Sequence, residues 1–166
     1  MTAIATTAGK LSTANPAAPA GIRPFESRDE EQVVALWQSC GLTRPWNDPH
    51  RDIARKQATQ PELFLVGTID DPIVSTAMVG YEGHRGWVYY LAVSTVHQRK
   101  GLGRSMMDEA ERLLVARGCP KINLQLRSSN SEAIGFYRAL GYLQDDVLSL
   151  GKRLIEDREW RSSAVR

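Results

Sequence analysis

Apolar and polar positions follow two periods along the chain, and the change of period marks the predicted elements. Short β-branched or alternating runs between turn residues are typical of strands, whereas an apolar stripe at every third and fourth position is typical of a helix. Turns at 70–72 and 83–86 join three of the predicted strands as hairpins. Strands are predicted over residues 22–26, 63–69, 73–81, 87–93, 122–126 and 142–154.

Four amphipathic helices are predicted between these strands. The first follows a capping-box pattern, Ser27-x-x-Glu30, and ends at Gly41, while the fourth is capped by Asn130 and ends at Gly141. The second begins at 48–49 and ends before Pro61, and the third runs from Leu102 to Gly118. The order β-α-α-β-β-β-α-β-α-β has no internal repeat. It predicts an α/β fold, α+β in some schemes, with a mixed sheet covered by helices.

Length and charge narrow the function classes. A chain of 166 residues is expected to form one domain, here residues 21–157, with tails at 1–20 and 158–166. The first tail is rich in Ala, Thr and Pro and is predicted to be disordered. A net charge of +2 predicts neither a nucleic-acid nor a membrane partner. No apolar run approaches the roughly 18 residues of a membrane helix, so we expect a cytoplasmic protein. Cys40 and Cys119 lack metal-ligand spacing, and no metal is expected.

A glycine-bearing loop between the strand at 87–93 and the third helix is the most informative stretch. Backbone N–H groups at a helix start attract anions, and Gly101 and Gly103 allow close approach. Arg99, Lys100 and Arg104 add positive charge suited to a phosphate, although a glycine turn with solvated charges is the alternative. No Walker loop is present. A dinucleotide fingerprint also fails, because Met106 stands where its third glycine belongs.

Two motifs in this region resemble those of the GNAT acetyltransferase family. Residues 98–103, QRKGLG, match the signature Q/R-x-x-G-x-G/A, and residues 130–142, NSEAIGFYRALGY, match the second motif N-x-x-A-x-x-F-Y-x-x-x-G-F/Y. The resemblance covers about residues 22–157 and implies a mostly antiparallel GNAT-type sheet. Residues 44–49, 80–86 and 149–157 look like the bacterial YpeA-like branch.

The resemblance implies acetyl-coenzyme A as co-substrate. Its pyrophosphate would lie on the glycine loop and its pantetheine arm along the preceding strand, where a family bulge aims an N–H at the thioester carbonyl. Asn130 would reach the cofactor, although it is equally well explained as a helix cap. The expected cofactor-binding residues are Leu91, Ala92, Val93, Gln98, Arg99, Lys100, Gly101, Leu102, Gly103, Arg104, Asn130 and Tyr137.

The resemblance also implies an acid and a base. Tyr137 is the expected catalytic acid at the leaving sulfur, with core packing as the alternative. The family often places a carboxylate on a central strand, but residues 87–93 contain none, so Glu82 is the expected catalytic base and His84 the second candidate. Both could instead be solvated turn residues. Trp46, Glu82 and His84 are the expected acceptor-binding residues, although Trp46 could simply pack its loop.

The resemblance therefore implies an N-acetyltransferase that acts by direct attack of a primary amine in a ternary complex. The acceptor is a small molecule or a peptide amine, and a homodimer is one option for its assembly. One alternative is a coenzyme A-binding sensor without turnover. Another is a subunit whose cleft docks a partner peptide, with Trp46 and residues 160–166 buried by that chain.

Overall fold

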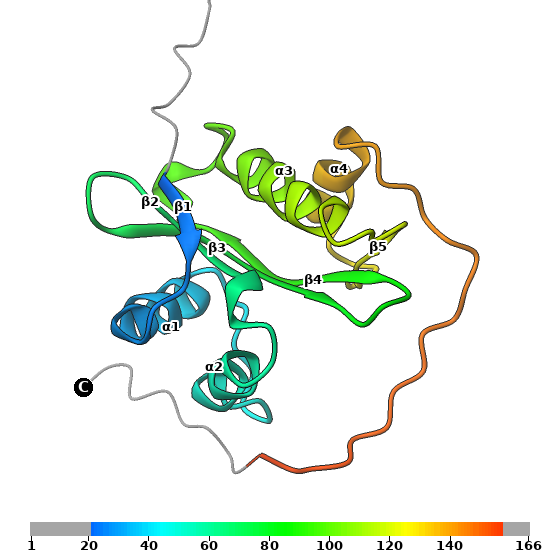
Figure 1. Ribbon diagram of the computed structural model, residues 1–166, viewed down its shortest axis with the longest axis horizontal. Helices are drawn as coiled ribbons and strands as arrows, with labels where there is room; N and C mark the ends of the chain where they lie inside the picture. The colour runs from blue at the N-terminus through cyan, green and yellow to red at the C-terminus, as the bar shows by residue number, and fades with distance from the viewer. Residues whose placement is uncertain (1–20, 158–166) are drawn as a thin grey trace, which may run out of the picture.

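The computed structural model describes residues 21–157, which form a five-stranded sheet between two pairs of helices (Figure 1). The tails predicted at 1–20 and 158–166 lie outside the described residues. Strand order follows the chain, from β1 to β5, with four antiparallel strands and a parallel pairing of β4 with β5. The α/β fold class and the mostly antiparallel sheet are thus confirmed. The strands are β1 (Gly21–Pro24), β2 (Phe64–Thr68), β3 (Ile73–Tyr81), β4 (Gly86–Val93) and β5 (Ile122–Asn123).

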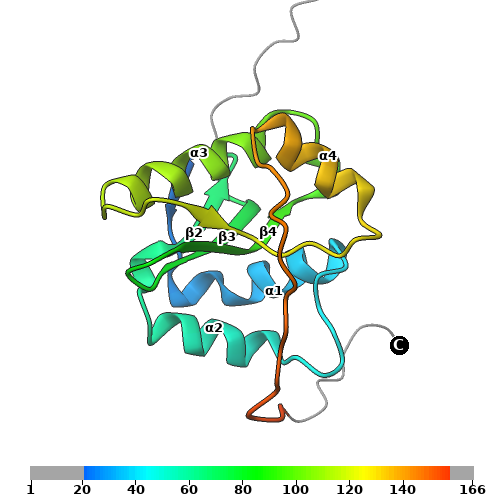
Figure 2. The ribbon, with the colours of Figure 1, turned by 90° about the vertical axis from the view of Figure 1, so that its right-hand side faces the viewer.

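The helices cover both faces of the sheet. Figures 1 and 2 show α1 and α2 on one face and α3 and α4 on the other. Three short 3-10 turns precede α1, β2 and the glycine loop, at Ser27–Asp29, Pro61–Leu63 and Thr95–His97. The helices are α1 (Glu30–Ser39), α2 (Pro49–Gln57), α3 (Leu102–Val115) and α4 (Ser131–Ala139).

Alternation along the inner strands divides the core into two layers, because successive side chains of a strand point to opposite faces. Phe64 and Val66 of β2 pack under α1 and α2, together with Trp37 and Ile53. Leu65, between them in sequence, packs under α3 with Met106, Met107, Ala110, Leu114, Val79 and Val88. The sheet is therefore buried on both faces, as the apolar runs at 63–69 and 73–81 require.

The start of α1 differs slightly from its prediction. The capping box lies one residue earlier than Ser27-x-x-Glu30 and caps the 3-10 turn that leads into α1, because Asp29 accepts a hydrogen bond from the N–H of Glu26 at 2.8 Å. Asp29 also pairs with Arg23, whose Nη1 lies 2.6 Å from Oδ2. This guanidinium lowers the pKa of the buried Asp29 carboxyl and makes Asp29 the better capping residue.

Strand β4 carries a bulge in its second half. Thr76 of β3 pairs with Ala92 of β4, and Met78 pairs with Tyr89. One residue therefore separates the two pairs on β3, whereas two residues separate them on β4. Tyr90 absorbs the extra residue with a left-handed φ of 50°. Its carbonyl accepts a hydrogen bond from Thr76 Oγ1 at 2.8 Å, and its ring stacks on Trp37 at 3.9 Å. These contacts hold the bulge in place.

Beyond the bulge, β4 loses its neighbour on the β5 side. The two strands pair only at Gly86 with Ile122 and Trp87 with Asn123, so the predicted strand at 122–126 is shortened to two residues. Among the described residues, no strand pairs with this edge of β4 from Val88 to Val93. A wedge therefore opens between β4 and the chain that leads to α4.

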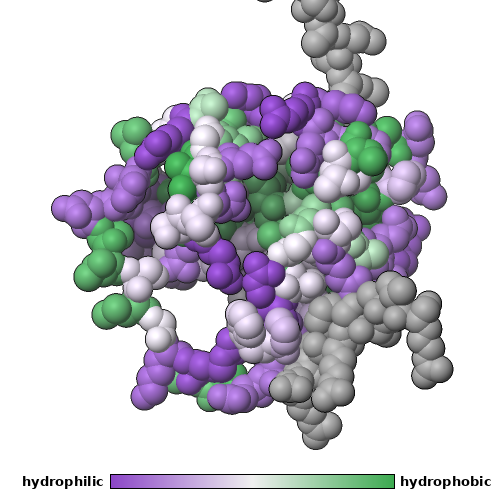
Figure 3. All heavy atoms as spheres, turned by 180° about the vertical axis from the view of Figure 1, so that it is seen from behind, coloured by the Kyte–Doolittle hydropathy of each residue, from purple (hydrophilic) through white to green (hydrophobic). Residues whose placement is uncertain are grey.

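The last predicted strand, 142–154, is wrong. This stretch has no regular secondary structure and pairs with no strand within residues 21–157. Only side chains connect it to the β5 segment: Lys121 Nζ lies 2.5 Å from Asp145, and Gln125 Nε2 donates to Ser149 Oγ at 2.5 Å. Because no strand pairs with this stretch, its backbone N–H and C=O groups are left to form hydrogen bonds with water. Figure 3 shows the stretch bowing away from the body around an open gap.

Candidate active site

Two cavities lie beside β4, one on each side of its bulge. The first, called the cofactor-side cavity, has a volume of about 630 Å³. It contains every predicted cofactor-binding residue except Lys100, which lies exposed in the loop. Its wall comes from the end of β4, the glycine loop, the start of α3 and one face of α4. The lining residues are Cys40, Leu42, Leu91, Ala92, Val93, Gln98, Arg99, Gly101, Leu102, Gly103, Arg104, Asn130, Glu132, Ala133, Phe136, Tyr137, Ala139 and Leu140.

The start of α3 offers unpaired donors to this cavity. Gly101 is the N-cap with a left-handed φ of 84°, and no side chain caps the helix. The first intrahelical bond runs from Ser105 N to Gly101 O at 3.0 Å, so the N–H groups before it face the loop. Arg99, Lys100 and Arg104 are exposed around it. This combination suits an anion with several negative oxygens.

Gly103 has a packing role that the sequence did not indicate. A Cβ at this position would lie 3.1 Å from Phe136 Cζ of α4. The missing side chain therefore lets α4 approach α3, which brings Tyr137 to the cavity. Gly101, by contrast, has open space around it and is needed for its positive φ.

The free edge of β4 forms the floor of the cofactor-side cavity. The Val93 carbonyl accepts from Gln98 Nε2 at 3.1 Å and from Cys40 Sγ at 3.4 Å. Gln98 thereby closes the loop onto the strand. The remaining backbone groups of 88–93 on this edge have no strand partner in the described chain, so they can pair with an extended ligand that carries amides.

Tyr137 lies at the inner end of the cavity. It is 7% exposed and packs edge-on against Phe136 and Tyr142, with ring centroids 5.0 and 5.6 Å away. Its hydroxyl has no hydrogen-bond partner within residues 21–157. Burial raises the pKa of Tyr137 to about 12, so the phenol keeps its proton at neutral pH. Tyr137 thus packs in the core and also lines the cofactor-side cavity.

Asn130 caps α4, since its side-chain oxygen accepts from Ala133 N at 3.1 Å. The capping interpretation is therefore confirmed. The amide nitrogen of the same side chain is left without a protein partner in the described residues and lies on the wall of the cavity. The residue can fill both roles, because capping uses only the oxygen.

The second cavity, called the acceptor-side cavity, has a volume of about 510 Å³ and lies between α2 and the sheet. Tyr90 Oη donates to Asp52 Oδ2 at 2.7 Å and accepts from Asn47 Nδ2 at 3.0 Å, while Asn47 also donates to Asp52. Burial, and after it the contact with Asp52, raises the pKa of Tyr90 far above its ordinary value. The lining residues are Asn47, Asp52, Arg55, Lys56, Thr59, Met78, Val79, Gly80, Tyr89 and Tyr90.

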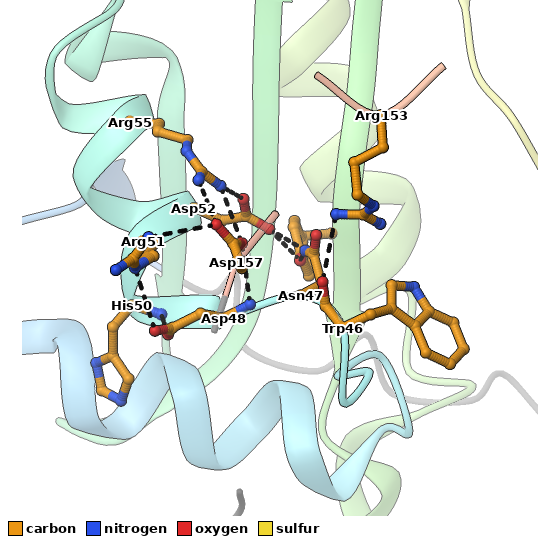
Figure 4. Close-up of polar contacts among 10 residues, drawn as sticks. Trp46, Asn47, Asp48, His50, Arg51, Asp52, Arg55, Arg153 and Asp157 are labelled. Atoms are coloured by element: carbon orange, nitrogen blue, oxygen red, sulfur yellow. Dashed lines mark hydrogen bonds and ion pairs between the residues drawn. The ribbon is translucent and has the colours of Figure 1, made fainter. Parts of the chain in front are cut away.

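The C-terminal segment is anchored at this cavity (Figure 4). Arg55 Nη2 lies 2.5 Å from Asp157 Oδ1 and its Nη1 lies 3.0 Å from Asp52 Oδ1. Asp157 is buried and also accepts from Asp48 N at 3.3 Å. Arg153 donates to the Trp46 carbonyl at 3.3 Å. No motif selects Asp52 or Asp157 from the sequence; the available signal was a group of polar residues on α2 at positions 52, 55 and 56.

The predicted acceptor residues do not gather in either cavity. Glu82 and His84 lie in the exposed β3–β4 turn, where Glu82 accepts from Arg85 N at 2.7 Å and from Trp87 Nε1 at 2.9 Å. Trp46 is 54% exposed beside Asn47 and lines neither cavity. The roles of these three residues stay predictions.

Residues 21–157 contain neither a candidate membrane-spanning helix nor a candidate metal-ligand cluster. No helix of this part of the chain has both the length and the apolarity to cross a membrane. In the same stretch, no three His, Cys, Asp or Glu side chains cluster as metal ligands would.

Comparison with solved structures agrees with this architecture. The chain superimposes on Ard1 from Thermoplasma volcanium with a TM-score of 0.69 and 26% identity, covering 76% of this chain and 84% of that one. The ribosomal-protein-S18-alanine N-acetyltransferase from Escherichia coli gives 0.61 and 24% identity over 72% and 75%. AAC(6')-Iy, solved with a coenzyme A bisubstrate analogue, gives 0.68 and 14% identity over 82% and 99%.

The family model described as "Acetyltransferase (GNAT) family" matches residues 31–142, which include α1, the whole of β2 to β5, the glycine loop and α4. That match spans both motifs and most of both cavities. The chain is therefore an acyltransferase and belongs to the GNAT acetyltransferase family.

Proposed function

We propose that the protein transfers the acetyl group of acetyl-coenzyme A to a primary amine by direct attack in a ternary complex. The observation that supports this most is that adjacent residues at the β4 bulge line the two cavities, Tyr90 on one side and Leu91 on the other. On one side lie an anion-binding helix start and a protonated phenol, and on the other lies a carboxylate hydrogen-bonded to a second phenol. Such an arrangement can hold a thioester and an amine face to face.

The cofactor-side cavity fits coenzyme A in its chemistry. Its pyrophosphate would take the N–H groups of the α3 start, with Arg99 and Arg104 beside it, and its pantetheine amides would pair with the free edge at 91–93. The co-substrate supplies the activated acetyl group as a thioester. A backbone N–H of the bulge at 90–91 would hold the carbonyl oxygen as it becomes negative.

In the proposed reaction, the amine nitrogen attacks the thioester carbon, the C–N bond forms and the C–S bond breaks. The thiolate leaves with the sulfur electron pair and takes a hydrogen bond from the Tyr137 hydroxyl. A phenol with a pKa of about 12 does not hand its proton fully to a thiolate of ordinary pKa near ~8.5. Tyr137 therefore stabilises the leaving sulfur, and solvent completes its protonation.

The attacking amine must lose a proton, and we favour Asp52 over Glu82 as its acceptor. Asp52 lines the acceptor-side cavity, and its Oδ2 holds the Tyr90 hydroxyl next to the bulge. Glu82 lies in an exposed turn outside either cavity, whereas Asp52, which also accepts hydrogen bonds at both oxygens, stands where an acceptor amine could reach it. The amine proton would pass to Asp52 directly or through one water.

The acceptor remains a small-molecule amine or a peptide amine. Two structural neighbours are named for different acceptors, a ribosomal-protein alanine for the Escherichia coli enzyme and an aminoglycoside for an acetyltransferase from a soil metagenomic sample. Titration calorimetry with acetyl-coenzyme A, followed by thiol release with a panel of amines, tests the proposal. Binding followed by amine-dependent thiol release is expected. Binding without release by any amine would favour a coenzyme A sensor, and no binding would contradict the cofactor site.

A further inference from the structure

A chain of two hydrogen bonds runs through the core beside the β4 bulge. The Trp37 indole N–H donates to Thr76 Oγ1 at 2.9 Å, and the Thr76 hydroxyl donates to the Tyr90 carbonyl at 2.8 Å. Trp37 of α1 and Thr76 of β3 are both fully buried. An indole N–H can only donate and a carbonyl can only accept, so the direction of both bonds is fixed. The hydroxyl proton of Thr76 therefore points at Tyr90.

This chain of bonds determines which way the peptide between Tyr90 and Leu91 faces. A trans peptide directs its carbonyl and its N–H to opposite sides, and the described residues contain no cis peptide. The Tyr90 carbonyl points to β3, since Thr76 belongs to that strand. The Leu91 N–H of the same peptide is then directed to the other edge of β4, which has no strand partner there among residues 21–157. Leu91 lines the cofactor-side cavity at that edge.

The conformation of Tyr90 needs support from its surroundings. Its φ of 50° lies in the left-handed region, which is unfavourable for a residue with a side chain. Turning the 90–91 peptide over would present the Tyr90 carbonyl to the cavity in place of the N–H. The ring of Tyr90 stacks on Trp37 at 3.9 Å and its hydroxyl bonds to Asp52 at 2.7 Å, but these contacts fix the side chain. Within residues 21–157, Thr76 is the side chain that bonds to the peptide itself.

We propose that Thr76, oriented by Trp37, is a positioning residue for acetyl transfer and aims the Leu91 N–H at the thioester carbonyl oxygen. This inference rests on the proposed function, in which an N–H of the bulge holds that oxygen as it becomes negative. An oxyanion donor is most effective when it is aimed before the reaction starts, because nothing then has to reorganise. A buried hydroxyl with both its partners in place keeps the peptide aimed, since water cannot compete for the bonds.

Thr76→Val tests the inference, because it replaces the hydroxyl with a methyl group of similar size. We expect kcat to fall by about tenfold or more, a part of the roughly 100- to 1000-fold loss that follows removal of an oxyanion donor. The Kd for acetyl-coenzyme A, measured by calorimetry, should change by less than about twofold. Thr76→Ser keeps the hydroxyl and should keep most of the kcat.

The neighbouring residue Ser75 provides a matched control. Its hydroxyl is equally buried on β3, yet it has no hydrogen-bond partner within residues 21–157. Ser75→Ala therefore removes a buried hydroxyl from the same strand without touching the 90–91 peptide. We expect this variant to have the kcat of the wild type.

A spectroscopic measurement separates the aiming of the N–H from packing of the core. Infrared difference spectra of bound acetyl-coenzyme A, with and without an isotope label at the thioester carbonyl carbon, report the hydrogen bond to that oxygen and need no acceptor amine. The wild-type carbonyl band should lie at lower frequency than that of free acetyl-coenzyme A. In Thr76→Val the band should return toward the free value. Trp37→Phe keeps a ring beside Tyr90 but removes the donor to Thr76, and its band should lie between the two.

Three results would overturn the inference. They are a Thr76→Val protein with wild-type kcat, an equal loss of kcat in Thr76→Ser, and a Thr76→Val carbonyl band that stays at the wild-type frequency. If a thermal melt shows that Thr76→Val does not fold, the band of Trp37→Phe decides, and a wild-type frequency there would overturn the inference. Failure of the wild type to bind acetyl-coenzyme A, or of every amine to release thiol, would instead contradict the proposed function.

Discussion

The two cavities beside β4 are built in different ways. Almost all of the cofactor-side cavity comes from two short segments, 91–104 and 130–140, which also carry the recognisable motifs. The acceptor-side cavity is assembled from the α1–α2 loop, one face of α2 and the residue Thr59 beyond it, and short runs of β3 and β4. A cofactor used by a whole family needs one fixed set of groups, whereas an acceptor differs from enzyme to enzyme. The cofactor-side cavity can therefore be predicted from sequence motifs, whereas the acceptor-side cavity can be found only from the folded structure.

The largest expected effect separates the two candidate bases. Asp52→Asn should lower kcat/KM for the amine by about 100-fold, because general-base catalysis is worth at least that much in many enzymes. Glu82→Gln is the matched change at the other candidate base and should alter kcat/KM for the amine by less than about twofold. Steady-state kinetics with saturating acetyl-coenzyme A measures both. A large loss in Glu82→Gln and none in Asp52→Asn would restore the original assignment of Glu82.

The next effect concerns the leaving sulfur. Tyr137→Phe should lower kcat by about 10- to 100-fold, the worth of one hydrogen bond to a charged group, with little change in acetyl-coenzyme A affinity. Tyr142→Phe is the matched control, since its ring packs against Tyr137 while its hydroxyl donates to Glu111 at 2.8 Å. If both variants lose activity equally, packing rather than the hydroxyl is responsible.

The pH dependence of kcat tests whether Tyr137 only donates a hydrogen bond or transfers its proton. Because the raised pKa of Tyr137 is about 12, the phenol stays protonated as the pH rises to 10, and it should produce no alkaline decline below that. Wild-type and Tyr137→Phe profiles should therefore be parallel from pH 7 to 10. An alkaline limb near pH 9 that disappears in Tyr137→Phe would show that Tyr137 transfers its proton fully.

The fold was predictable where local periodicity and packing agree. The apolar runs at 63–69 and 73–81 and the stripe that includes Trp37 describe elements that the core needs, and they form nearly where expected. The stretch at 142–154 was also predicted to be a strand, but it has no partner strand among the described residues. A strand depends on its neighbour, so its own sequence cannot establish it.

The site divides in the same way. Gly101 and Tyr137 lie in motifs, and the structure brings them to one cavity. Asp52 and Tyr90 are 38 positions apart and meet only because the bulge turns Tyr90 toward α2. On the sequence alone, the polar face of α2 looks like an ordinary solvated surface. The charged turn with Glu82 attracted the prediction instead, because it stands next to a central strand.

A smaller effect is expected at the glycine loop. The double change Arg99→Ala/Arg104→Ala should raise the KM for acetyl-coenzyme A by about tenfold, since each exposed cation contributes modestly to binding a phosphate. Salt should weaken wild-type binding more than it weakens binding by the variant. Arg112→Ala, an exposed arginine on α3 paired with Glu109, controls for charge alone. An unchanged KM in the double variant would mean that backbone donors hold the pyrophosphate unaided.

The smallest effect concerns the anchor behind the acceptor-side cavity. The Arg55 guanidinium lowers the pKa of Asp157 below its ordinary value of 3.8. A lowered carboxyl pKa stabilises the folded state above the ordinary value and loses that contribution as the pH falls through the folded value. Asp157→Asn should therefore reduce the urea midpoint slightly at pH 7, and the difference from wild type should close as the pH falls below the ordinary carboxyl value and through the lowered pKa. Equal midpoints at pH 7 would mean that Arg55 is held by Asp52 alone, and the C-terminal segment would then have no part in shaping the acceptor side.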